Sequence, residues 1–196
     1  MLANIAAGAV QRAAVHDQAR HRAEQLATLN TIGRTLVELL DLPQIFEQLA
    51  VAIQQICPDM LALLISQYDT TRQVMTCVYG WERGQLLDIT QFPPAPLEPL
   101  GYGAQSESIH ARQPVIVKDL PARLKRARTS VIVGEEALSA VYVPLLAKGE
   151  VIGVVQVQSH TYNRFSSEDA EVLSLLAGTA AIAIQNARFF EAERRE

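Results

Sequence analysis

The chain has 196 residues and a formal net charge of −4, and 49% of its residues are hydrophobic. This composition is too apolar for a disordered chain. The length suits one domain with a helical appendage. The negative charge argues against nucleic acid as a partner. The cysteines, Cys57 and Cys77, lack metal-binding spacing, and no apolar run approaches the roughly 18 residues of a membrane span, so we expect a cytoplasmic protein.

Two helices are predicted first. From about residue 16 to residue 40, apolar residues recur at spacings of three and four, which indicates an amphipathic helix. Its seam consists of Leu26, Leu29, Gly33, Leu36 and Leu40. A second helix is predicted from Pro43 to Ile56, because Asp41 suits the N-cap and Pro43 suits the first turn. We assign residues 1–22 to an N-terminal helical extension.

The pattern then becomes strand-like. Residues 60–69 and 73–81 are apolar, β-prone runs separated by a short turn, which predicts a hairpin. Residues 83–103 contain four prolines and no periodicity, so we expect a loop there. A short helix over residues 104–113, a short strand and a basic segment over residues 118–130 follow.

A second hairpin is predicted over residues 138–158. Because residues two apart in a strand share a face, Gln156 and Gln158 should point the same way, together with Val154 and Ile152. Two amides on one face of an otherwise apolar strand indicate either a polar pocket or an exposed sheet rim.

The last helix has the clearest start signal. Ser166 suits the N-cap position and Asp169 can complete a capping box. Residues 173–187 leave little polar face, so the helix should be buried on more than one side. A stripe on it is expected to join the first helix in a four-helix bundle between two copies. The stripe consists of Leu176, Ala180, Ile184 and Ala187.

This order of elements predicts an α+β fold with a mostly antiparallel sheet of five or six strands. The first and last helices should cover one face of the sheet. The irregular middle of the chain is left for the other face, which is therefore the expected place for a cavity.

Two stretches of the second half, "VPLLAKGEVIGVVQVQS" and "RFSSEDAEVLSLLAGTAAIAIQNARFF", resemble the GAF domain family, the small-molecule-sensing module of signalling proteins. The resemblance covers roughly residues 26–190, and it implies a GAF/PAS-like fold that agrees with the one predicted above. We place the domain at residues 23–190. We expect residues 191–196 to be the end of a signalling helix that leads to a missing downstream domain.

The resemblance also implies a ligand pocket on the sheet face opposite the terminal helices. In tetrapyrrole-binding members of the family, one polar position of the last strand points into this pocket. That position corresponds to Gln158 here, and Gln156 shares its face. By strand alternation, Tyr142 and Ser66 are expected to point into the same pocket. Tyr102, in a Gly-rich turn, and Arg126, in a basic segment that can attract an anionic ligand, complete the candidate contacts.

Cofactor and catalytic motifs of the family are missing or incomplete in the sequence. The cysteine motifs for bilin attachment are absent, and His110 is expected to be a surface or capping residue rather than a haem ligand, so we expect neither bilin nor haem. The cyclic-nucleotide motif is matched only in part, around Arg164. Cys57 and Cys77 do not match the cysteine group of the free methionine sulfoxide reductases and are expected to be unreactive.

The chain is therefore interpreted as a non-enzymatic sensory module with an unknown small-molecule ligand. It would form a homodimer and act on an output domain such as a histidine kinase or a cyclase. The alternatives are a purely structural dimerisation module without a ligand and a GAF-type methionine sulfoxide reductase.

Overall fold

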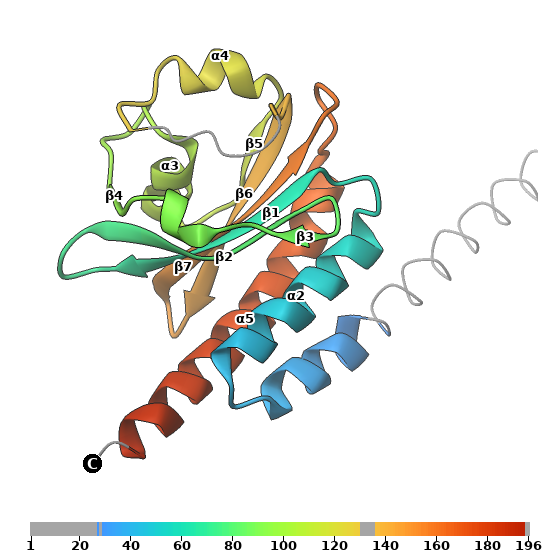
Figure 1. The fold of residues 1–196 in the computed structure, drawn as a ribbon, viewed down its shortest axis with the longest axis vertical. Coiled ribbons are helices and arrows are strands. Elements are labelled where there is room, and N and C mark those ends of the chain that lie inside the picture. Colours follow the sequence, from blue (N-terminus) through green and yellow to red (C-terminus); the bar gives the residue numbers. More distant parts are fainter. Residues whose placement is uncertain (1–26, 28, 130–135, 195–196) are drawn as a thin grey trace, which may run out of the picture.

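The computed structural model describes residues 27, 29–129 and 136–194 (Figure 1). The predicted N-terminal extension and Leu26 lie outside these residues. A helix over residues 29–38 comes first. The further elements are α2 (Leu42–Ile56), β1 (Ala62–Asp69), β2 (Val74–Glu82), β3 (Gln85–Leu86), the 3₁₀ turn η1 (Ile89–Gln91), β4 (Ala95–Pro96), α3 (Ala104–Ala111), β5 (Val115–Val117), α4 (Leu120–Leu124), β6 (Ser139–Ala147), β7 (Glu150–Ser159) and α5 (Ser167–Glu193).

The strands form one antiparallel sheet in the order β3-β2-β1-β7-β6-β5, and β4 pairs with β2. This confirms the predicted α+β fold and its antiparallel sheet. Strands β3 and β4, of two residues each, lie in the segment that was predicted to be a loop. A two-residue strand has no alternation to detect, so the sequence pattern could not reveal them.

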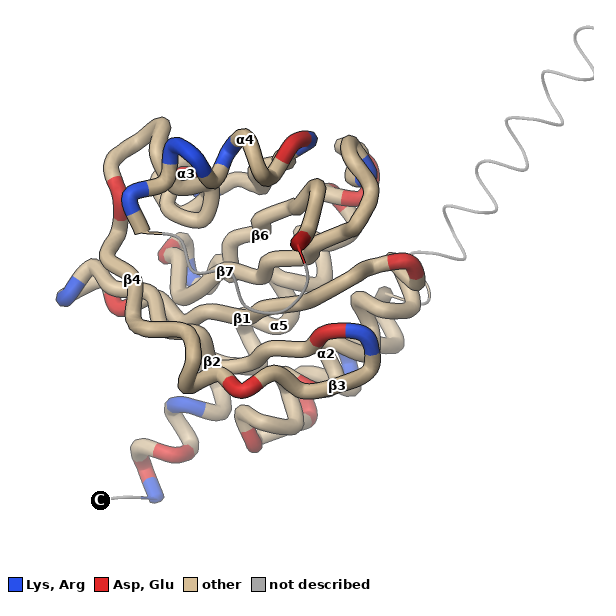
Figure 2. Tube along the Cα trace, turned by 45° about the horizontal axis from the view of Figure 1, so that its top comes forward, with Lys and Arg blue, Asp and Glu red and all other residues tan. Residues whose placement is uncertain are grey.

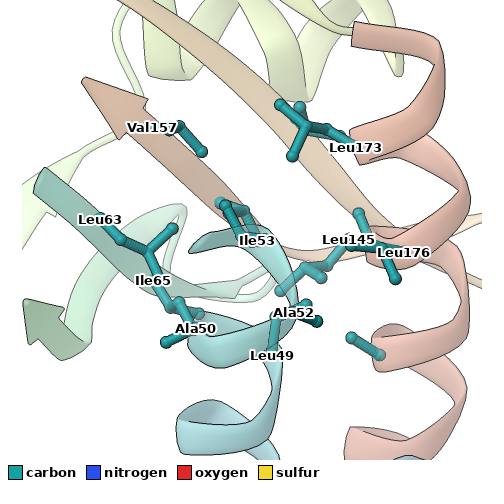
Figure 3. Close-up of a cluster of buried hydrophobic side chains, with 14 of the residues drawn as sticks. Leu49, Ala50, Ala52, Ile53, Leu63, Ile65, Leu145, Val157, Leu173 and Leu176 are labelled. Atoms are coloured by element: carbon teal, nitrogen blue, oxygen red, sulfur yellow. The ribbon is translucent and has the colours of Figure 1, made fainter. Parts of the chain in front are cut away.

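The three long helical segments cover one face of the sheet (Figure 1). Residues from α2, α5 and the strands form one large core, which includes Leu49, Ile53, Leu63, Val157 and Leu176 (Figure 3). The 29–38 helix packs closely on α5, because a Cβ atom at Gly33 would lie 3.2 Å from Cγ2 of Thr179. The prediction that the first and last helices share one face is confirmed.

The predicted helix caps are present. Asp41 accepts a hydrogen bond from the backbone N–H of Gln44. The Ser166 hydroxyl accepts from the N–H of Asp169, and the Asp169 carboxylate accepts from the N–H of Ser166, which makes a complete capping box. Each cap satisfies backbone donors that a helix start leaves unpaired and contributes about 1 kcal/mol.

A β-bulge in the second hairpin corrects one predicted side-chain orientation. Leu145 pairs with Gly153, but Leu146 pairs with Val151, so Ile152 has no partner in the ladder. Ile152 packs against the helix-side core, whereas Val154 belongs to the cluster on the opposite face. The expectation that Ile152 shares the face of Gln156 and Gln158 was therefore wrong, because strict alternation holds only up to a bulge.

The apolar stripe expected to join a dimer interface lies inside this chain's own core. Its four residues, Leu176, Ala180, Ile184 and Ala187, are at most 1% exposed. Four large apolar residues of α5 are exposed, and three of them, Leu175, Ile182 and Phe189, form a different stripe with a spacing of seven residues; the fourth is Phe190. By length and composition α5 could cross a membrane. In this structure it packs on β6 and α2, and half of its most apolar stretch is buried.

Candidate ligand-binding site

A cavity of about 700 Å³ lies on the sheet face opposite the helical layer. Its floor comes from β1, β2, β6 and β7, and its walls come from the segment around β4, the start of α3, and α4 with the residues that follow it. Charged residues gather in loops and at the ends of elements, while the central strands are uncharged over most of their length (Figure 2). The cavity therefore has an uncharged floor and a charged rim.

Four of the predicted site residues line this cavity: Ser66, Tyr142, Gln156 and Gln158. The strand register brings them together, because Gln156 pairs with Leu64 on one side and with Tyr142 on the other. Both glutamines are half-buried rather than exposed. Of the two sequence interpretations, the pocket therefore agrees with the structure and the exposed rim does not.

The other two predicted residues do not line the cavity. Arg126 is exposed in the turn after α4, where its N–H donates to the carbonyl of Arg123, and Lys125 and Arg128 line the wall instead. Tyr102 lies outside the wall, and the guanidinium of Arg128 stacks on its ring, 4.1 Å from the centroid. The sequence located the basic segment, but only the fold of the turn selects which of its residues reach the cavity.

The phenol of Tyr142 is buried. Its side chain is enclosed by the sheet and α3, and this burial raises its pKa well above the usual value. A phenol is already neutral at physiological pH with its usual pKa, and the burial of Tyr142 moves its ionisation further from that range.

The two cysteines lie in different environments. Cys57 is buried in the helix-side core, and Cys77 is half-buried in the cavity floor, where its thiol donates to the carbonyl of Tyr79 at 3.5 Å. Burial is the largest cause that raises the pKa of each thiol to about 11. At neutral pH both are thiols rather than the thiolates that react as nucleophiles.

Glu98, the acidic residue that is buried in the cavity wall, was not among the predicted site residues. It lies in the proline-rich segment that was predicted as a loop, which gives no periodicity from which burial could be inferred. His110 is exposed, and its Nε2 lies 2.9 Å from the Glu98 carbonyl oxygen, so the imidazole helps to hold the backbone of Glu98 in place. Within the described residues, no group of three or more His, Cys, Asp or Glu side chains is placed to hold a metal ion.

A sequence-family model of the GAF domain matches residues 40–185, which include α2, the whole sheet and most of α5. The chain belongs to the GAF domain family. The matched span contains every residue of the cavity wall.

Solved structures of low sequence identity share the GAF fold. The GAF domain of a phosphoenolpyruvate-protein phosphotransferase from Coxiella burnetii is 20% identical, with a TM-score of 0.70 over 86% of this chain and 96% of that one. The free methionine-R-sulfoxide reductase from Neisseria meningitidis, in complex with its substrate, is 19% identical, with a TM-score of 0.67 over 86% and 92%. Residues 122–287 of a methyl-accepting chemotaxis protein are 21% identical, with a TM-score of 0.66 over 82% and 99%. No curated protein matches the sequence.

In this GAF domain, the segment that partly matches the cyclic-nucleotide motif has a structural role. Arg164 forms a bidentate ion pair with Asp59, with distances of 2.5 Å and 2.8 Å, and lies 3.4 Å from a carboxylate oxygen of Asp169. The hydrogen bond from Arg164 lowers the pKa of Asp59 below its usual value. These contacts join the α2–β1 connection to the start of α5, and Arg164 does not line the cavity.

Proposed function

We propose that this GAF domain is a non-enzymatic sensory module that binds a small organic molecule in the cavity. The observation that carries the proposal is the cavity itself. Its volume of about 700 Å³ lies within the range of small-molecule sites, roughly 300–1,000 Å³, and its floor combines apolar side chains with a few polar groups, among them Gln156, Gln158 and Ser66. Such a floor suits an organic ligand that has both an apolar body and polar groups, without a haem, bilin or metal.

The sheet offers a direct path from the ligand to the helices. Gln156 faces the cavity, whereas its neighbours Val155 and Val157 pack in the helix-side core. A ligand that shifts β7 would therefore also shift the surface on which α2 and α5 pack. Because packed helices move between discrete arrangements, such a shift can reach an output domain, such as a kinase or a cyclase, through α5.

We also propose that the domain acts as a cytoplasmic homodimer. The exposed stripe of Leu175, Ile182 and Phe189 has the seven-residue spacing of a helix-pairing seam. Leu175 of this stripe lines a groove between α5 and the 29–38 helix, together with Val37 and Leu29. A second copy would cover this apolar surface and align the output domains of the two chains. The competing interpretation, a dimerisation module without a ligand, uses the same surface but gives no role to the polar floor of the cavity.

The similarity to the reductase from Neisseria meningitidis makes methionine sulfoxide reduction the second candidate function. Two features of the thiols argue against it. Cys57 and Cys77 belong to opposite sides of the sheet, and each has a pKa of about 11, so neither is poised to attack a sulfoxide at neutral pH.

An activity assay separates the two functions. With free L-methionine-(R)-sulfoxide and dithiothreitol at pH 7.5, we expect methionine to form no faster than in a reaction without protein, whereas an authentic reductase assayed in parallel should show turnover. The same rate is expected for Cys77→Ser. Methionine formation by the wild-type protein that Cys77→Ser abolishes would replace the sensor proposal with an enzyme.

A further inference from the structure

Glu98 is the only acidic or basic residue that is buried among the residues the structure describes, with 4% of its surface exposed. It lines the cavity together with apolar side chains, including Leu64, Met75 and Phe92. A buried carboxylate is costly unless a counter-charge and hydrogen bonds compensate for lost water. The hydrogen-bond and ion-pair partners of its backbone and carboxylate atoms therefore indicate the role of Glu98.

The backbone of Glu98 is held rigidly by α3. Its N–H donates to the Ser106 hydroxyl at 2.9 Å, and its carbonyl oxygen lies 2.9 Å from Nε2 of His110. One carboxylate oxygen, Oε1, accepts hydrogen bonds from the hydroxyl of Thr129, at 2.7 Å, and from its backbone N–H. The side chain is thus fixed before any ligand arrives, as in preorganised binding sites.

The second carboxylate oxygen, Oε2, is buried and has no hydrogen-bond partner among the described residues. Those residues also include no Lys or Arg in an ion pair with it, although Lys125 and Arg128 line the same cavity. A Cβ atom at Gly103 would lie only 2.6 Å from Oε2, so glycine at this position leaves the space that the carboxylate occupies. The N-terminus of α3 reduces the cost of the charge but supplies no hydrogen bond to this oxygen.

We propose that Oε2 of Glu98 is the anchor for a cationic nitrogen, and that the ligand is a small organic amine that is protonated at neutral pH. This inference rests on the proposed ligand-binding function and specifies the ligand class. An ammonium group would supply both the hydrogen bond and the counter-charge that no described residue gives to Oε2. The apolar side chains around it suit a hydrocarbon body, and the amides of Gln156 and Gln158 offer hydrogen bonds to a polar group on that body.

Matched pairs of probes test the charge requirement directly. We would measure the thermal unfolding midpoint of the purified protein with phenethylamine against 2-phenylethanol, and with tyramine against 4-(2-hydroxyethyl)phenol, each at 10 mM. The members of each pair share a skeleton and differ in the cationic nitrogen. We expect at least one amine to raise the midpoint by about 5 °C, the shift that corresponds to a ligand well above its Kd, and its neutral partner to raise it by less than about 1 °C.

Three variants assign the effect to Oε2. Glu98→Gln keeps an oxygen that can accept from Thr129 but removes the charge, so it should abolish the shift of the unfolding midpoint by the amine. It should also raise the unfolding midpoint of the ligand-free protein by a few degrees, because an uncompensated buried charge is lost. Gly103→Ala keeps the charge but displaces the carboxylate, and it should also weaken the amine shift. Glu107→Gln is the control, since Glu107 pairs with Arg123 and does not line the cavity, and it should keep the amine shift.

Three results would overturn the proposal: no amine stabilises the wild-type protein, the neutral partners stabilise it as well as the amines do, or Glu98→Gln binds amines as tightly as wild type. The broader sensor function would survive the second result if that stabilisation disappeared in Gln158→Leu. The two proposals can therefore fail separately.

Discussion

Ile184→Glu should unfold the domain rather than split a dimer. The side chain of Ile184 is 1% exposed in the core between α5 and the sheet, so a glutamate there would bury a charge without a partner. We expect a loss of at least about 4 kcal/mol in the free energy of unfolding, which is comparable to the whole stability of many domains. Urea titration followed by circular dichroism would measure this loss.

Ile182→Glu is the matched control, two residues away on the same helix. Its side chain is 51% exposed, so the charge stays in water and the free energy of unfolding should change by less than about 0.5 kcal/mol. If the exposed stripe of α5 joins two copies, light scattering should show the mass of Ile182→Glu falling from dimer to monomer. Equal stability of the two variants would contradict the assignment of the two faces of α5.

Gly153→Ala should be the most damaging single methyl group in the sheet. A Cβ atom at this position would lie 2.4 Å from the backbone carbonyl oxygen of Ser66, a contact that only a shift of β1 against β7 can relieve. We expect a loss of about 3 kcal/mol, because overpacking against backbone cannot be absorbed by a rotamer change. The same shift would move Ser66 in the cavity floor, so ligand binding should weaken as well.

Gly178→Ala provides the opposite expectation. A Cβ atom at Gly178 would meet nothing within 4 Å, and the residue lies within α5, so alanine should raise the free energy of unfolding by about 1 kcal/mol. Denaturant titrations of both variants would give the two changes side by side. If Gly153→Ala were as stable as wild type, the close approach of β1 and β7 would be wrong.

Local signals in the sequence were sufficient for much of the fold and for part of the site. Capping residues placed the starts of α2 and α5, and strand alternation placed Gln156, Gln158, Tyr142 and Ser66 around one cavity. The signal failed where the regular pattern is interrupted. A bulge moved Ile152 to the other face of the sheet.

Other features depend on contacts that no local pattern contains. Glu98 follows a run without periodicity, and its burial comes from α3 and Thr129, which are brought to it by the fold. The helix α5 is apolar on most sides, so its sequence could not show which stripe packs on its own sheet. The stripe of Leu176 and Ile184 was assigned to a partner for this reason, and the structure places it in the core.

The central claim is that the cavity beneath Gln156 and Gln158 binds a small organic molecule, and competitive dialysis tests it most directly. Wild-type protein and the double variant Gln156→Leu, Gln158→Leu would be dialysed in separate chambers against one small-molecule cell extract, after circular dichroism has shown that both are folded. Mass spectrometry of the denatured proteins would then compare what each retains. The sensor account predicts at least one organic compound enriched with the wild-type protein and not with the double variant. Identical compound profiles in the two chambers would contradict it.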